Sequence, residues 1–111
     1  MIDDLSSADY NRGMIEIKQT LEFAAWLSGI KDGLTRRRLA TRLRKATLGN
    51  LGDVRAVGDG VFEMREHFGP GWRLYYVQRG PVLILMLGGG DKSTQAADIA
   101  KANALASTLE D

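Results

Sequence analysis

The chain has 111 residues, an apolar fraction of 44% and a charged fraction of 26%, which exclude disordered and fibrous proteins and predict one globular domain. It has no cysteine and one histidine, so disulfides and thiolate ligands are excluded and we expect no metal and no cofactor. No apolar run approaches the ~20 residues that span a bilayer, so we expect a cytoplasmic protein without a membrane partner.

The net charge of +1 hides a basic centre. Residues 31–48 hold seven lysine or arginine residues and one aspartate, whereas both ends of the chain are mildly acidic. These cations form either a solvated helix face or a surface for nucleic-acid phosphates or for an acidic protein segment. We therefore expect an anionic partner to bind at the centre of the chain.

The first expected element is a short strand. Residues 1–13 lack periodicity and are predicted to be a flexible extension, which leaves residues 14–111 as the folded domain. Ile15 and Ile17 alternate with charged residues, and this alternation predicts a half-buried strand over residues 14–20.

A helical hairpin is expected next. Apolar residues recur at helical spacing over residues 21–30, with Thr20 placed to cap this helix and Asp32 and Gly33 placed to end it. Residues 34–48 are predicted to form a second helix, with leucines facing inward and arginines facing outward. The short turn between the two helices predicts that they pack as a hairpin.

Short apolar runs separated by glycine-rich turns then predict an antiparallel meander of strands. In the run 61–68, alternation places Phe62 and Met64 on one face and Glu63, Arg65 and His67 on the other. In the run 72–79, it places Arg73, Tyr75 and Val77 opposite Trp72, Leu74 and Tyr76. The run VLILML, residues 82–87, is apolar on both faces, which is typical of a central strand.

The sequence GGGDKST, residues 88–94, has the composition of a phosphate-binding loop. It is not a P-loop, because Asp91 stands where that motif requires a glycine. We interpret it as a strand-to-helix turn in which the glycines relax the backbone and Ser93 or Thr94 caps a final helix. That helix has apolar or small residues at helical spacing: Ala96, Ile99, Ala100, Asn103 and Ala104. Lys92 near its start would suit an anion arriving from outside.

The expected fold class is α+β: an N-terminal strand, a helical hairpin, an antiparallel β-meander and a C-terminal helix. Three motifs along this order carry a resemblance: GDGVFEMR at 58–65, GPGWRLYY at 69–76 and GGDKSTQAADI at 89–99. Over residues 14–108 the chain resembles the RelE/ParE toxin superfamily and, more narrowly, the HigB-like addiction module killer proteins.

The resemblance implies a microbial RNase-type fold and the toxin half of a type II toxin–antitoxin module. Such a toxin would cleave mRNA on translating ribosomes without a metal, and a cognate antitoxin, a helix-turn-helix protein encoded adjacently, would neutralise it. Cleavage requires a base for a ribose 2′-hydroxyl and cations for the developing phosphoryl charge.

The resemblance assigns phosphate stabilisation to Arg73 and a second basic position to Lys92. Arg65 joins them as a catalytic candidate because it is expected on the neighbouring strand and the same face, and His67 joins them as a candidate base. The residues expected to bind RNA are Arg65, Arg73, Tyr75 and Lys92. Arg73 is expected on an exposed face of the sheet. The candidates for the general base are His67, Glu63 and Tyr75, and His67 is otherwise a surface residue beside a turn. The basic centre supplies Arg38, Arg42 and Lys45 as antitoxin contacts.

The chain departs from RelE in two places. The strand lysines of RelE are replaced around residues 62–64, and Asp98 stands in the region of a C-terminal tyrosine. Two alternatives therefore stand beside the ribonuclease: a ParE-like protein that poisons DNA gyrase by binding without catalysis, and a degenerate toxin fold that only binds an antitoxin.

Overall fold

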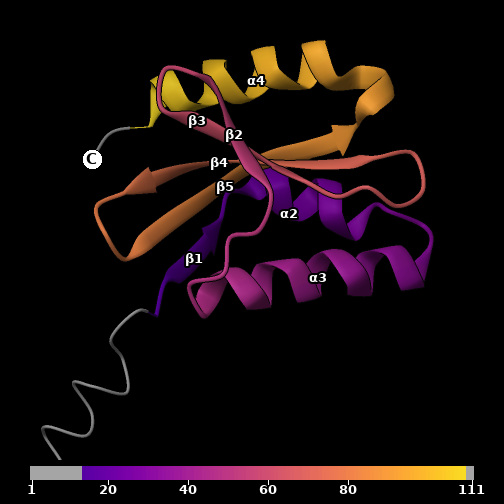
Figure 1. Ribbon diagram of the computed structural model, residues 1–111. Helices are drawn as coiled ribbons and strands as arrows, with labels where there is room; N and C mark the ends of the chain where they lie inside the picture. Colours follow the sequence, from indigo (N-terminus) through magenta and orange to yellow (C-terminus); the bar gives the residue numbers. More distant parts are fainter. Residues whose placement is uncertain (1–13, 110–111) are drawn as a thin grey trace, which may run out of the picture.

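The structure, a computed structural model, describes residues 14–109, and the extension expected at residues 1–13 lies outside this range. The predicted order of strand, two helices, four strands and final helix is confirmed, and so is the α+β fold class (Figure 1). The elements are β1 (Glu16–Gln19), α2 (Leu21–Ser28), α3 (Gly33–Thr47), β2 (Val54–Gly58), β3 (Val61–Arg65), β4 (Trp72–Arg79), β5 (Leu83–Asp91), the 3₁₀ helix η1 (Lys92–Thr94) and α4 (Gln95–Thr108). Among the described helices, none is long and apolar enough to cross a membrane.

The five strands form one sheet in the order β1-β5-β4-β3-β2. Strands β2 to β5 pair antiparallel in sequence order, as the meander predicts, and β1 pairs parallel to β5 at the opposite edge from β2. Helices α2 and α3 cover one face of the sheet and α4 covers the other (Figure 1). Because both faces are covered, the central strands carry apolar side chains on both sides.

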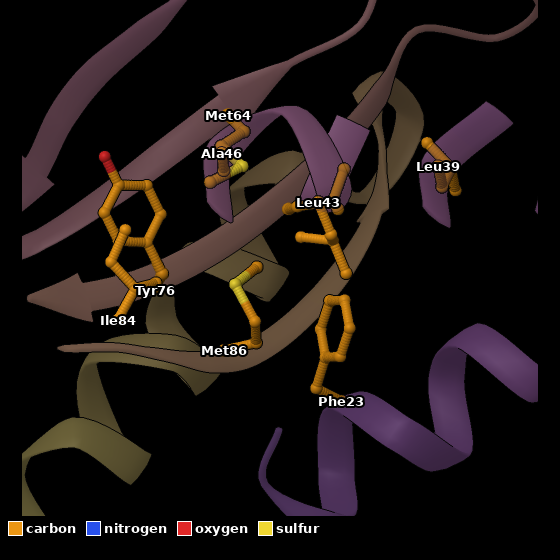
Figure 2. Close-up of a cluster of buried hydrophobic side chains, with 9 residues drawn as sticks. Phe23, Leu39, Leu43, Ala46, Met64, Tyr76, Ile84 and Met86 are labelled. Carbon is orange, nitrogen blue, oxygen red and sulfur yellow. The ribbon is translucent and has the colours of Figure 1, made fainter. Parts of the chain in front are cut away.

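The larger core lies between the sheet and the helical hairpin. Figure 2 shows Phe23 of α2 and Leu43 of α3 directed toward Met86 of β5. Full burial of a large apolar side chain stabilises a fold by about 1.5–3 kcal/mol, so this layer is a major source of stability. Its buried members are Phe23, Leu39, Leu43, Ala46, Met64, Leu74, Tyr76, Ile84 and Met86.

The predicted start of α2 is confirmed, but its predicted end is wrong. Thr20 caps α2 as expected, because its hydroxyl accepts a hydrogen bond from the backbone N–H of Phe23 at 3.1 Å. Helix α2 already ends at Ser28, and Asp32 begins the next helix instead of ending this one. The Asp32 carboxylate accepts hydrogen bonds from the hydroxyl and the backbone N–H of Thr35, and these bonds lower the pKa of Asp32.

The predicted alternation along β3 and β4 is confirmed. Met64 and Leu74 belong to the core under α2 and α3, whereas Val61 and Tyr75 belong to the second core under α4. The alternation therefore correctly placed Arg73 on the same face as Tyr75, but that face lies beneath a helix.

Helix α4 is rotated from the predicted orientation. Of the predicted inward positions, Ile99 packs on the sheet and Asn103 is half-buried, but Ala96, Ala100 and Ala104 are exposed, and Ala102 is buried in their place. Thr94 is the N-cap residue of α4, as predicted, but its side chain makes no capping hydrogen bond to the helix backbone. Contacts made by Gln95 and Asp98 with the sheet explain the orientation, and both lie on the side of α4 that the alanine spacing did not mark.

The glycine triplet is part of strand β5 and not a relaxed turn. A Cβ atom on Gly89 would overlap the Trp26 ring of α2, and one on Gly90 would overlap the Asp98 carboxylate of α4. A Cβ atom on Gly88 would meet nothing within 4 Å. Two of the three glycines therefore let helices on opposite faces approach the strand closely.

We expect Gly90→Ala to lower the free energy of unfolding by about 1–3 kcal/mol, because the added methyl group displaces Asp98 from the strand. Gly88→Ala is the matched control on the same strand and should change stability by less than about 0.5 kcal/mol or stabilise slightly. Urea unfolding of the two variants measures the difference. Equal urea midpoints for the two variants would show that Gly90 is not needed for the approach of Asp98 to the strand.

Candidate functional site

The candidate site lies where β3 ends, β4 begins and β5 runs into η1. In the sheet register, Arg65 of β3 is paired with Arg73 of β4, and Trp72 is paired with Asp91 of β5. Lys92 follows Asp91 directly and is the first residue of η1. Two cations from paired strand positions and a third from the start of η1 thus lie at one end of the sheet.

Gly71 brings two of these cations together. It is buried and has a φ of +84°, a left-handed conformation that suits glycine. A Cβ atom on Gly71 would lie 2.6 Å from Cδ of Lys92 and 3.7 Å from Nη1 of Arg73. The aliphatic stem of Lys92 therefore crosses the Gly71 backbone beside the guanidinium of Arg73.

Arg73 is buried, contrary to its expected exposure, among the carbonyl oxygens at the end of β3 and the start of β4 and the Glu63 carboxylate. Its relative exposure is 5%, and Nη1 donates hydrogen bonds to the carbonyl oxygens of Glu66 at 3.1 Å and Trp72 at 3.0 Å. Nε is enclosed without a hydrogen-bond partner and lies 3.9 Å from Oε1 of Glu63. Nη2 is neither enclosed nor hydrogen-bonded to any residue in the range 14–109, so it is the nitrogen left for a ligand.

Glu63 lies behind Arg73 and is fully buried. Its Oε2 accepts hydrogen bonds from the Tyr75 hydroxyl at 3.1 Å and from Nε2 of Gln95 at 2.7 Å. Its Oε1 accepts a hydrogen bond from Nε of Arg55 at 3.1 Å. A carboxylate enclosed in this way contacts no substrate, so Glu63 is not the general base.

Tyr75 was expected to bind RNA or to act as a base, and its position rules out both roles. The ring is fully buried under α4, and its hydroxyl donates to Glu63. Burial, followed by the charge of Glu63, raises the pKa of Tyr75 above its usual value. A phenol with a raised pKa stays protonated at neutral pH, and this agrees with a donor role within the core.

His67 and Arg65 meet at a third residue, Asp53. Oδ2 of Asp53 lies 2.8 Å from Nε2 of His67 and 3.3 Å from Nε of Arg65. These two partners lower the pKa of Asp53. His67 is 67% exposed, so its ring is open to a ligand on the side away from Asp53.

Sequence and structure comparisons bear on this arrangement. No protein-family model matches the chain. A Haemophilus influenzae protein, described as uncharacterized, is 43% identical over 95 residues, which cover 86% of this chain and 96% of that protein. The chain belongs to the family of this protein.

The structure is similar to that of a mutant of the E. coli toxin RelE in the free state. The TM-score is 0.64 at 14% sequence identity, with 86% of this chain and 99% of the RelE chain covered. The protein therefore has a RelE-like fold, as the three motifs predicted.

In this RelE-like fold, Arg42 is a structural residue and not an outward-facing antitoxin contact. It is 8% exposed, and its guanidinium donates to the carbonyl oxygens of Leu51, Asp53 and Arg65 and to the Glu66 carboxylate. The prediction that all α3 arginines face outward was wrong here because Arg42 lies one position before Leu43, at the edge of the buried stripe.

Four of the other five cations of α3 form an exposed basic face, which we define as Arg37, Arg38, Arg44 and Lys45; the fifth, Arg36, is half-buried and donates to the backbone before the helix. The Arg38 guanidinium lies over the Phe68 ring, 3.7 Å from its centroid, so this face is tied to the loop between β3 and β4.

Sequence reasoning missed Asp53 and Gln95. Gln95 stands in the third motif, but nothing in a single sequence shows that it reaches Glu63 on another strand. Asp53 follows a glycine-rich turn, where an acidic residue is common.

Proposed function

We propose that this protein is the toxin of a type II toxin–antitoxin module of the HigB-like group and that it cleaves mRNA on translating ribosomes without a metal. The observation that carries the proposal is the convergence of Arg65, Arg73 and Lys92 at one end of a RelE-like sheet, with His67 bound to Asp53 beside them.

The proposed chemistry uses these side chains as follows. Nδ1 of His67 takes the proton of the ribose 2′-hydroxyl, while Asp53 holds the opposite nitrogen of the ring. The 2′-oxygen attacks the phosphorus, the bond from phosphorus to the 5′-oxygen breaks, and the leaving 5′-oxygen takes a proton from water, which leaves a 2′,3′-cyclic phosphate. Nη2 of Arg73 and the Lys92 ammonium stabilise the negative charge that develops on the phosphoryl oxygens. Arg65 holds Asp53 and adds positive charge to the same surface.

Expression of the protein without an antitoxin tests the proposal. We expect growth arrest in which incorporation of labelled amino acids falls before incorporation of thymidine, because mRNA on ribosomes is the substrate. Pulse labelling in the minutes after induction measures the order of the two losses. If DNA synthesis stops first and DNA-damage signalling rises, the protein is a gyrase poison; growth without arrest indicates a degenerate toxin fold.

The proposed antitoxin is a helix-turn-helix protein encoded adjacently, with an acidic segment that covers the basic face of α3. With Arg42 buried, the contacts offered to it are Arg38 and Lys45. A short open reading frame beside the gene, encoding such a protein, supplies the partner for a binding experiment.

We expect the double charge reversal Arg38→Glu and Lys45→Glu to weaken antitoxin binding by at least about tenfold, or ~1.4 kcal/mol, and to reduce its salt dependence. Lys101→Glu is the matched control, an exposed cation on α4 at the opposite face of the sheet. Calorimetric titrations at two salt concentrations measure both effects. Unchanged affinity would place the interface elsewhere.

A further inference from the structure

The three sequence motifs meet at one buried carboxylate. Glu63 comes from the first motif, Arg73 and Tyr75 come from the second, and Gln95 comes from the third. The cleavage chemistry proposed above gives Glu63 no role, because its carboxylate is enclosed.

The two oxygens of Glu63 have different partners. Oε2 accepts from two neutral donors, the Tyr75 hydroxyl at 3.1 Å and the Gln95 amide at 2.7 Å. Oε1 faces two guanidinium groups, with Nε of Arg55 at 3.1 Å and Nε of Arg73 at 3.9 Å. The neutral donors thus fix the rotation of the carboxylate, and this rotation directs Oε1 at the two cations.

The guanidinium of Arg73 is held from two directions. Its Nη1 is tied to two carbonyl oxygens, and its Nε has one charged neighbour, Glu63, to attract it. A planar guanidinium that is restrained at Nη1 and Nε keeps Nη2 in one direction, and Nη2 is the nitrogen left for a ligand.

We propose that Glu63 is a positioning residue: its buried carboxylate orients the guanidinium of Arg73 so that Nη2 is presented to a phosphate of the substrate. The inference rests on the proposed function for the identity of the substrate. The orientation of Arg73 itself can be measured without any RNA.

The first experiment therefore uses NMR on ¹⁵N-labelled protein. The Nε–H signal of Arg73 is assigned by its loss in Arg73→Lys, and its exchange with water is measured in Glu63→Gln, which keeps the size of the side chain and removes the charge. We expect exchange to be at least roughly tenfold faster in this variant, because the attraction that holds Nε is lost. Arg55→Ala, which removes the other cation at Oε1, is the matched control and should leave the signal unchanged.

Glu63→Asp provides a second variant if Glu63→Gln does not fold. It keeps the negative charge but withdraws it by one methylene group, so exchange at Arg73 Nε should lie between the wild-type and Glu63→Gln rates. Unchanged exchange in folded Glu63→Gln or Glu63→Asp protein would overturn the proposal.

The second experiment measures single-turnover cleavage of ribosome-bound mRNA. Glu63→Gln should reduce the rate by about 10- to 100-fold, as is typical when a partner behind a ligand-binding residue is removed. It should cause no further loss when added to Arg73→Lys, because both changes act through one guanidinium. Full additivity would overturn the proposal. If the wild-type protein cuts no RNA, the proposed function fails, and the exchange measurement still decides whether Glu63 orients Arg73.

Discussion

Arg73→Ala is expected to slow the cleavage of ribosome-bound mRNA by roughly a hundred- to a thousand-fold. The loss corresponds to about 2.7–4 kcal/mol of transition-state stabilisation, by analogy with removal of one oxyanion donor. Nη2 of Arg73 is neither enclosed nor bonded within the described range, so the residue offers a donor to a phosphoryl oxygen beside Lys92. Arg73→Lys should recover only part of the rate, because an ammonium lacks the planar fork of a guanidinium.

The burial of Arg73 adds an effect on stability. The alanine variant removes one of the two cations that face the buried Glu63 carboxylate, and we expect it to lower the free energy of unfolding by about 1–3 kcal/mol. Urea unfolding and antitoxin binding measured on the same preparation separate this effect from catalysis. If folded Arg73→Ala protein cleaves mRNA at the wild-type rate, Arg73 does not stabilise the transition state.

Arg42→Ala is expected to cause the largest loss of stability among alanine substitutions of the α3 cations. The change removes a donor from three backbone carbonyl oxygens and the counter-ion from Glu66. Breaking a buried ion pair costs about 3–5 kcal/mol of stability. We expect the lower end of this range, because the Glu66 side chain is 23% exposed to solvent.

Arg44→Ala is the matched control, since this arginine lies two positions further along α3 and is exposed. It should change the free energy of unfolding by less than about 0.5 kcal/mol. Urea unfolding of both variants provides the comparison. Similar small losses in the two would show that the Arg42 contacts contribute little, and binding of the antitoxin should then be retested with Arg42 included.

The sequence alone was sufficient for the order of the elements and for the face on which each strand residue lies. Alternation with a period of two correctly separated Met64 and Leu74 from Val61 and Tyr75, because successive strand residues point to opposite faces of any sheet. The inward positions of α3, Leu39 and Leu43, followed from helical spacing in the same way. These patterns are local, and for these residues packing agreed with them; in α4, contacts of Gln95 and Asp98 with the sheet overrode the alanine spacing.

The sequence also placed the cationic candidates Arg65 and Arg73 on one face of the predicted sheet. The resemblance carried by the three motifs added the RelE-like fold, which the structure comparison supports. The resemblance also predicted Lys92 beside Arg73 at the sheet-to-helix junction. How the two side chains meet depends on the register between β4 and β5 and on the bare backbone of Gly71, and only the tertiary structure showed this.

The tertiary structure alone decided which of these residues are buried. Arg42, Tyr75 and Arg73 have polar groups that suit a surface, and each was assigned to one from the sequence. Each is enclosed by groups from other parts of the fold. Helix α4 lies over Tyr75, the Glu66 carbonyl and the Glu63 carboxylate enclose Arg73, and the backbone carbonyls of Leu51, Asp53 and Arg65 surround the guanidinium of Arg42. Burial of a polar group depends on whether partners arrive from elsewhere in the chain to satisfy it, and that information is not local.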